Sequence, residues 1–314
     1  MHWSGVSVVI PVFQSVETLP ELVERIDLTL AALGNYEVIF VDDGSAEATW
    51  SAIVDLSTHW PQVAGVRLGR NYGQHNALVA GIRAASMPIT VTIDDDLQNP
   101  PEEIPLLVNA LVCDDLDVVY GVPERPAQTL PRQLAGRIIR NALKRGLSVE
   151  SAPTVSSFRA FRTTSRNAFA RDLGSNVSLD ALLTWGSKRY GSVTVRHDPR
   201  TVGTSNYTVS KLLKFAIDTT TGYSTVPLQA ASVLGLATAL FGLAIIAFVV
   251  GRLIITGESV PGFPFLAASI AIFAGVQLLT LGIIGEYLAR MHFRVMGKPT
   301  YVICETTRDL GPQL

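Results

Sequence analysis

The chain has 314 residues and a formal net charge of -2, so nothing in its charge indicates a polyanion such as nucleic acid as a main partner. Its mean hydropathy of +0.31 favours one soluble domain joined to a strongly apolar region over two soluble domains. The two cysteines, Cys113 and Cys304, lack the paired spacing of a zinc site and are interpreted as structural thiols.

The first 120 residues alternate short β-rich runs with helical patterns. Buried strands are predicted over residues 6–11, 37–41, 63–68, 89–93 and 117–120. Helices are predicted between them, over residues 19–33, 46–56, 74–85 and 102–111. Strands that alternate with helices predict a mostly parallel, Rossmann-like α/β sheet with helices on both faces and ligand sites at the carboxyl ends of its strands.

Beyond residue 120 the patterns are weaker. A basic helix is predicted over residues 131–145, and strands over 157–161 and 192–197. Residues 210–221 alternate lysines with apolar residues, which favours a helix lying along a membrane surface. The alternative is an ordinary amphipathic helix of the soluble domain.

Two long apolar runs follow, over residues 232–255 and 263–288. At about 1.5 Å per residue, each is long enough to cross a hydrocarbon core of about 30 Å, whereas the alternative is a buried helix of a soluble protein. The positive-inside rule predicts that both flanks lie in the cytoplasm, because basic residues precede and follow the pair: Lys211, Lys214, Arg290, Arg294 and Lys298. Residues 1–5 lack the pattern of a signal peptide, which also predicts a cytoplasmic first domain.

An acidic pair, Asp42-Asp43-Gly44-Ser45, follows the second predicted strand. Such carboxylates can accept hydrogen bonds from a base or ribose, while the glycine lets the backbone turn closely around the ligand. The same four residues also suit a plain turn, so this motif alone leaves both interpretations open.

Three adjacent carboxylates, Asp94-Asp95-Asp96, follow the fourth predicted strand. They repel one another unless they are solvated or neutralised by a cation, and their hard oxygen atoms favour Mg²⁺ or Mn²⁺. A metal at the Asp-x-Asp spacing could bridge two phosphates of a nucleotide diphosphate and stabilise it as a leaving group. A solvated acidic turn is the alternative.

These motifs, together with residues 8–13, the segment Arg70-Asn71-Tyr72-Gly73-Gln74-His75 and the two apolar runs, resemble the family 2 glycosyltransferases that make polyprenyl-phosphate sugars. The nearest groups are the bacterial polyprenyl-phosphate glucosyltransferases and the undecaprenyl-phosphate aminoarabinose transferases, with the dolichyl-phosphate mannose synthases more distant. The resemblance covers nearly the whole chain. It implies a GT-A fold, a nucleotide-sugar donor, a polyprenyl phosphate acceptor, Mg²⁺ or Mn²⁺ as cofactor, and inversion at the anomeric carbon.

The resemblance also implies roles for individual residues. The nucleotide-sugar would be bound by residues at the strand ends and in the later loops: Pro11, Phe13, Glu17, Asp42, Asp43, Arg70, Asn71, Gly73, Asp94, Asp95, Arg200, Ser205 and Tyr207. Asp96 with Gln98 would hold the metal, and which of Asp94 and Asp96 touches it directly stays open. Arg125 and Arg132 would bind the acceptor phosphate, and these two arginines with Asp94 and Asp96 form the predicted catalytic set.

Several positions depart from the family pattern. Gln14 and Ser15 stand where the family commonly has Asn-Glu, and Glu17 is interpreted as the substitute. Pro153, Gly136 and Asn206 replace an acidic residue, a serine and a lysine, which leaves donor identity and the acceptor contacts open.

The predicted domains are a catalytic domain (1–207), a juxtamembrane segment (208–228), two transmembrane helices (229–289) and a C-terminal tail (290–314). The protein is expected in the plasma (inner) membrane as a multi-pass protein with its catalytic domain in the cytoplasm. A homo-oligomer such as a tetramer is compatible with the sequence.

The mechanism needs no catalytic base, because a phosphomonoester has a second pKa of about 6 and is largely anionic at neutral pH. His75 is therefore interpreted as a structural or donor-contact residue. A UDP-sugar such as UDP-glucose is favoured as donor, with GDP-mannose as the alternative. A non-catalytic nucleotide-sugar-binding component of a lipid flippase and a processive polysaccharide synthase are competing functions, although the acceptor motif Gln-x-x-Arg-Trp of the synthases is missing.

Overall fold

The computed structural model describes residues 3–123, 156–169, 178–198, 226–256, 262–297 and 299–309. It divides into two compact units, one formed by Met1–Leu212 with Gly297–Leu314 and the other by Leu213–Met296. The predicted basic helix over 131–145 and the predicted amphipathic helix over 210–221 lie outside the described residues, as do five predicted site residues: Arg125, Arg132, Arg200, Ser205 and Tyr207.

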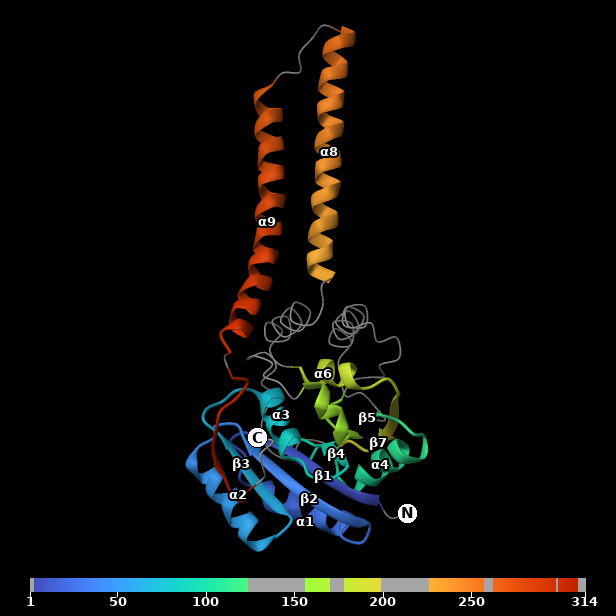
Figure 1. Ribbon diagram of the computed structural model, residues 1–314, viewed down its shortest axis with the longest axis vertical. Coiled ribbons are helices and arrows are strands. Elements are labelled where there is room, and N and C mark those ends of the chain that lie inside the picture. Colours follow the sequence, from blue (N-terminus) through green and yellow to red (C-terminus); the bar gives the residue numbers. More distant parts are fainter. Residues whose placement is uncertain are drawn as a thin grey trace. The chain divides into compact units, whose positions relative to one another are not determined.

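The first unit is built on an eight-stranded mixed sheet with the strand order β7-β5-β6-β4-β1-β2-β3-β8 (Figure 1). The strands are β1 (Trp3–Val12), β2 (Gly34–Asp42), β3 (Val63–Leu68), β4 (Ile89–Thr92), β5 (Val118–Pro123), β6 (Arg159–Arg162), β7 (Tyr190–Val195) and β8 (Ile303–Thr306). The central strands β4, β1, β2 and β3 run parallel, and β7 runs parallel to β5. Strands β6 and β8 pair antiparallel with their neighbours.

Helices follow the strands much as predicted. They are α1 (Leu19–Leu30), α2 (Glu47–His59), α3 (Gln74–Ala84), α4 (Ile104–Cys113) and α6 (Leu179–Gly186), with short 3₁₀ turns η1 (Pro101–Glu103) and η2 (Thr163–Phe169). Helix α1 begins at Leu19 with a proline in its first turn, and its buried residues recur every three or four positions, which places one apolar side against the sheet.

Alternate residues of β1 explain why both faces of the sheet are covered. Val8 and Ile10 belong to the core that includes Leu22 of α1. Val9 points to the opposite face, where a Cβ on Gly81 of α3 would lie only 2.4 Å from its Cγ1 atom. Successive side chains of a strand face opposite sides, so a nearly continuous apolar strand needs a helix on each side. The predicted α/β fold is confirmed.

Strand β8 comes from the segment after the apolar helices, for which the sequence predicted no strand. It pairs with β3 through Arg67 opposite Glu305 and Val66 opposite Thr306. The main-chain N–H of Thr307 donates to the Gly65 carbonyl oxygen at 3.1 Å. The end of the chain therefore completes the edge of the sheet.

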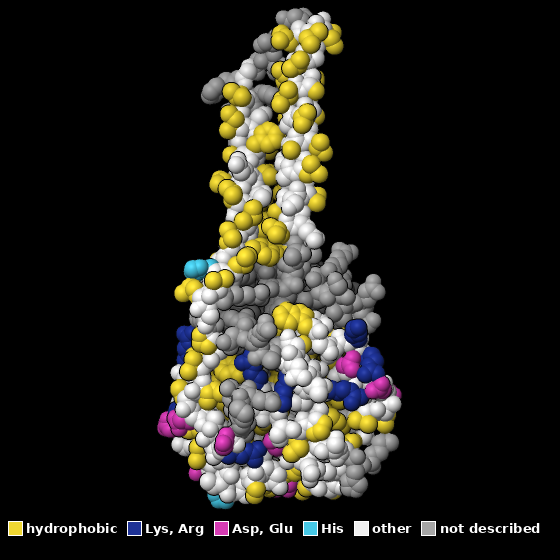
Figure 2. All heavy atoms as spheres, viewed as in Figure 1, with side chains coloured by type: hydrophobic (Ala, Val, Ile, Leu, Met, Phe, Trp, Pro, Cys, Tyr) yellow, Lys and Arg dark blue, Asp and Glu magenta, His cyan; other side chains and the backbone are white. Residues whose placement is uncertain are grey.

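The second unit contains two antiparallel helices, α8 (Val226–Thr256) and α9 (Phe263–Val295), which lie side by side (Figure 1). A Cβ on Gly242 would lie 2.8 Å from the Phe273 ring, so the glycine permits close packing between them. Apolar side chains cover their exposed surface (Figure 2). Two segments, Pro227–Ile255 and Ile272–Ala289, are long and apolar enough to cross a membrane, and none of their most apolar windows is buried. They are candidate membrane spans rather than core helices of a soluble fold.

Candidate active site

Two acidic turns flank the carboxyl end of β1. Strand β1 lies between β2 and β4 in the sheet, Asp42 ends β2, and Asp94 follows β4 closely. The main-chain N–H of Asp43 donates to the Val12 carbonyl oxygen at 2.9 Å, and that of Ile93 donates to the Val9 carbonyl oxygen at 3.2 Å. Both predicted motifs therefore lie at the edge of the sheet where parallel α/β folds bind ligands.

In the first turn, the carboxylate of Asp43 holds the loop that precedes α3. Its Oδ1 atom accepts a hydrogen bond from the main-chain N–H of Tyr72 at 2.7 Å, and its Oδ2 atom accepts one from Gly73 at 2.8 Å. Burial raises the pKa of Asp43, against the lowering effect of these two hydrogen bonds. The carboxylate thus fixes the Arg70-to-Gly73 segment, a structural task that a sequence motif does not reveal.

Asp42 is completely buried beside Asp43. Its Oδ1 atom accepts the main-chain N–H of Ser45 at 2.9 Å, while its Oδ2 atom accepts no hydrogen bond within the described ranges and lies 3.6 Å from Nε of Arg67. Gly44 has φ of 70°, and a Cβ there would lie 2.4 Å from the Arg70 carbonyl carbon. A side chain at this position would therefore collide with the Arg70 backbone, which explains the glycine.

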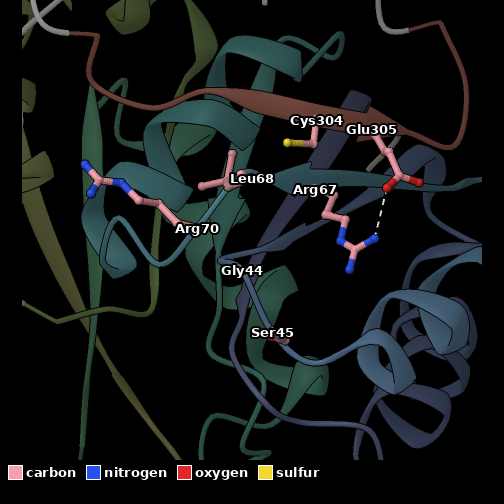
Figure 3. Close-up of a pocket in the computed structure, with 8 residues that line it drawn as sticks. Gly44, Ser45, Arg67, Leu68, Arg70, Cys304 and Glu305 are labelled. Atoms are coloured by element: carbon pink, nitrogen blue, oxygen red, sulfur yellow. Dashed lines mark hydrogen bonds and ion pairs between the residues drawn. The ribbon is translucent and has the colours of Figure 1, made fainter.

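A cavity of about 250 Å³ opens next to this turn (Figure 3). Its lining comes from the first turn, the end of β3 and strand β8: Gly44, Ser45, Arg67, Leu68, Gly69, Arg70, Cys304 and Glu305. The Arg67 guanidinium pairs with Glu305 at 2.9 Å and with Glu47 at 2.7 Å. Figure 3 shows Arg67 and Arg70 extending to opposite sides. Part of this wall belongs to the C-terminal tail, which the sequence analysis did not connect with the site.

In the second turn, both oxygen atoms of Asp94 accept hydrogen bonds from side chains. Gln74 Nε2 donates to Oδ1 at 2.7 Å, and Ser157 Oγ donates to Oδ2 at 2.6 Å. Gln74 begins α3 and Ser157 lies just before β6. The carboxylate is therefore oriented from two sides, a role of Gln74 and Ser157 that the sequence analysis missed.

Asp95 accepts hydrogen bonds from the Ser15 side chain and from the main-chain N–H of Phe13. The pKa of Asp95 is raised to about 6, mainly by burial and to a smaller extent by the neighbouring carboxylates of Asp94 and Asp96, against the lowering effect of these two donors. Ser15 is one of the positions that depart from the family pattern, and here it supports the acidic turn directly.

Asp96 and Gln98 lie at the tip of the second turn. The main-chain N–H of Gln98 donates to Asp96 Oδ1 at 3.2 Å, and the Gln98 carbonyl oxygen accepts the N–H of Asp198 at 2.8 Å. Leu97 between them has φ of 57°, an uncommon left-handed conformation for a non-glycine residue, with its side chain buried. Buried packing thus holds the turn that presents Asp96.

The oxygen donors of this turn fit a small divalent cation. Within the described ranges, no three His, Cys, Asp or Glu side chains gather as a metal-binding group. Mg²⁺ is commonly bound through one or two carboxylates plus substrate phosphates rather than by a cage of protein ligands. Asp94, Asp96 and Gln98 would supply that kind of donor set, and a nucleotide or water would supply the remaining ligands.

Other predicted residues occupy the rim of the same edge. Pro11 is buried at the end of β1, whereas Phe13, Glu17, Arg70 and Asn71 are exposed and Gly73 is half-buried. The Arg70 guanidinium lies 4.8 Å from the centre of the Tyr72 ring. These positions leave the rim side chains accessible to a ligand, while the buried aspartates maintain the loops that carry them.

His75 has the surroundings of a structural residue. Its Nδ1 atom accepts the main-chain N–H of Leu179, the first residue of α6, at 3.3 Å. Burial lowers the pKa of His75. The charge of Asp180 raises this pKa and that of Arg159 lowers it, both by less than burial does. A neutral imidazole that accepts a main-chain hydrogen bond ties α3 to α6 and is not arranged as a catalytic base.

An α/β sheet with an Asp-x-Asp turn at its carboxyl edge, beside a glycine-bearing loop, defines the class of the protein as an α/β protein with a candidate ligand site at that edge. More particularly, residues 7–169 match the family model "Glycosyl transferase family 2". The chain belongs to this family and is a glycosyltransferase with a GT-A fold.

Comparisons with individual proteins agree with this assignment. The chain is 34% identical to the undecaprenyl-phosphate 4-deoxy-4-formamido-L-arabinose transferase of Pectobacterium atrosepticum over 98% of its own length and 95% of that protein. The protein of the same name from Yersinia enterocolitica is 34% identical over 95% of this chain and 92% of its own. In structure, glucosyl-3-phosphoglycerate synthase of Mycobacterium tuberculosis with Mn²⁺, UDP-glucose and phosphoglyceric acid shares the fold, with a TM-score of 0.50, 17% identity and coverage of 70% and 78% of the two chains.

Proposed function

We propose that this glycosyltransferase moves a sugar from a nucleotide-sugar to a polyprenyl phosphate, with undecaprenyl phosphate as the first acceptor to test. The observation that carries the proposal is the oriented acidic turn at the carboxyl edge, in a chain that aligns over nearly its full length with transferases named for undecaprenyl phosphate. A UDP-sugar is the favoured donor, and the 4-deoxy-4-formamido-L-arabinose unit in the names of the relatives is the first sugar to compare with glucose.

On the donor side, the rim of the first turn and the end of β1 are proposed to hold the nucleoside, through Phe13, Arg70 and Asn71 over the loop that Asp42 and Asp43 fix. The second turn is proposed to hold the diphosphate through Asp96 and Gln98. A divalent cation bound there would neutralise charge on the departing nucleoside diphosphate.

On the acceptor side, the phosphate of the lipid is itself the nucleophile. An anionic phosphate oxygen forms a bond to the anomeric carbon while the bond from that carbon to the donor diphosphate breaks, and the diphosphate leaves with the electron pair. Attack opposite the leaving group inverts the configuration. Arg125 and Arg132, outside the described residues, are the proposed phosphate contacts, since a guanidinium can bind two oxygen atoms at once.

The two apolar helices are proposed to form a membrane hairpin that keeps the glycosyltransferase unit at the cytoplasmic face of the plasma membrane. Their lengths and exposed apolar side chains support this placement. The basic residues that flank the pair in the sequence support the orientation.

The proposal is tested with membranes that contain the full chain, undecaprenyl phosphate and a panel of nucleotide-sugars, with lipid products identified by mass spectrometry. The expected result is one polyprenyl-phosphate sugar whose formation requires Mg²⁺ or Mn²⁺. Binding of a nucleotide-sugar without any lipid product across the panel would contradict the proposal and favour the non-catalytic flippase component. A long polysaccharide product would favour a processive synthase instead.

A further inference from the structure

The Asp94 carboxylate accepts hydrogen bonds from two parts of the chain that are far apart in sequence. Gln74 lies 20 positions before Asp94 and Ser157 lies 63 positions after it, yet each donates to a different carboxylate oxygen. The 2.7 Å and 2.6 Å separations are at the short end for N–H···O and O–H···O bonds, as expected when the acceptor is ionised. Two donors on opposite oxygens leave the carboxylate little freedom to rotate.

The backbone of Ser157 is itself held by a hydrogen bond from β4. Thr92 Oγ1 donates to the Ser157 carbonyl oxygen at 2.7 Å and accepts from Arg159 Nε at 3.1 Å. Thr92 and Arg159 are register partners in the antiparallel pair of β4 and β6. The Ser157 hydroxyl, which donates to Asp94, therefore belongs to a segment that is hydrogen-bonded to β4, the strand that Asp94 follows.

An ion pair of a buried arginine anchors this network. Arg159 is only 2% exposed and is the largest fully buried side chain of the described residues. Its Nη1 atom pairs with Asp180 of α6, and the Tyr120 hydroxyl donates to the same carboxylate at 3.3 Å. A buried guanidinium is costly without such partners, so this pair constrains where β6, and with it Ser157, can lie.

On the other side, Gln74 extends from a helix start that is also fixed. Asp43 Oδ2 accepts the N–H of Gly73, directly before Gln74, and His75, directly after it, accepts the N–H of Leu179. The first acidic turn is thereby linked through the start of α3 to the second acidic turn.

We propose that Gln74 and Ser157 are positioning residues that hold the Asp94 carboxylate in the orientation that donor binding requires. This inference rests on the proposed function of the same site. Asp94 is followed by two further carboxylates, and a side chain repelled by its neighbours needs donors of its own to stay in one place. Holding it before the substrate arrives avoids reorganisation during binding and transfer.

The test compares Ser157→Ala and Gln74→Ala with Ser156→Ala as a matched control. The Ser156 hydroxyl accepts the main-chain N–H of Phe158 at 3.2 Å, whereas the bonds to the Asp94 oxygens come from Gln74 and Ser157. Mn²⁺ binding in the presence of UDP is measured by electron paramagnetic resonance, alongside kcat and KM for the donor. Ser157→Ala and Gln74→Ala are each expected to lose about ten-fold in Mn²⁺·UDP affinity and in kcat/KM, because a hydrogen bond to a charged group is lost.

Two further variants sharpen the result. Ser157→Thr retains the hydroxyl and should recover most of the lost affinity, and the double variant should lose less than the product of the single losses, because both donors act on one carboxylate. Unchanged Mn²⁺·UDP affinity in both alanine variants would overturn the inference, as would an equal loss in Ser156→Ala. A wild-type protein that makes no lipid product would refute the proposed function alone. The Mn²⁺·UDP affinities of the variants would still test whether Gln74 and Ser157 position Asp94.

Discussion

The two acidic turns of the sheet look alike in sequence and differ in structure. Asp42 and Asp43 are almost completely buried, and main-chain N–H groups of neighbouring loops occupy three of their four oxygen atoms. Asp94, Asp95 and Asp96 are half-buried, and Asp94 is held by side chains. Asp95 and Asp96 each accept one main-chain N–H as well, so accessibility separates the two turns. A fully buried carboxylate with main-chain donors shapes a loop, whereas one that stays partly accessible at the strand end is available to a ligand.

The largest effect is expected for Asp96→Asn. The change keeps the shape of the side chain and removes the charge that a divalent cation needs, so transfer should fall by about 10³-fold. Sugar transfer from labelled donor to lipid is the measurement, and thermal unfolding should stay close to that of the wild type. Transfer at the wild-type rate would remove Asp96 from the catalytic set.

The next effect concerns Asp95 and its dependence on pH in metal-free protein. Its pKa of about 6 in the folded state lies above the ordinary value of 3.8, so the folded state binds more protons between these values. Its contribution therefore favours the folded state at low pH and is lost as the pH rises through 6. At pH 7, Asp95→Asn should be more stable than the wild type by at most about 3 kcal/mol, and the advantage should vanish near pH 3.5.

Urea unfolding across pH 3.5 to about 7.5 in the presence of a chelator measures this difference between variant and wild type. Adding Mn²⁺ and UDP should reduce or reverse the stability advantage of Asp95→Asn over the wild type, because the bound cation favours the ionised aspartates. A stability difference that does not vary with pH would mean that Asp95 is ionised at little cost.

A smaller and opposite effect on stability is expected for Asp43→Asn. Both Asp43 oxygens accept main-chain N–H groups, and an amide would turn its NH₂ towards one of them. The variant should lose about 2 kcal/mol of unfolding free energy at pH 7. Urea unfolding is again the measurement, with Asp96→Asn as the comparison. Equal stability of the two asparagine variants would erase the proposed distinction between the turns.

The sequence predicted the half of the molecule whose strands and helices each carry their own local pattern of apolar and turn residues. The strands at 63–68 and 89–92 and the helix starts at Leu19 and Gln74 follow from local alternation and turn residues. Strand β8 could not be predicted this way, because four residues without periodicity gain their structure from pairing with β3, more than 200 positions earlier. Arg159 was missed for a related reason, since its burial depends on Asp180 and Tyr120, which meet it only in the folded sheet.

Strand β8 also provides the smallest predicted effect, at Glu305. This side chain binds Arg67 through one oxygen and accepts the Trp50 indole N–H through the other at 3.0 Å, so it holds Arg67 at the wall of the cavity beside the first turn. It is half exposed, and breaking such an ion pair should cost less than about 1 kcal/mol of stability. Because Arg67 lines the cavity, Glu305→Gln should nevertheless raise the donor KM by about two- to three-fold.

Asp115→Asn is the matched control for Glu305→Gln, because it weakens exposed ion pairs with Arg162, the last residue of β6, and Arg189, just before β7. Neither arginine lines the cavity. Both variants should unfold at similar urea concentrations, and only Glu305→Gln should change the donor KM. If both variants leave KM unchanged, the cavity wall formed by β8 does not contact the donor. The nucleoside would then depend on the rim formed by β1 and the Arg70 loop alone, and the C-terminal strand would serve the stability of the sheet edge.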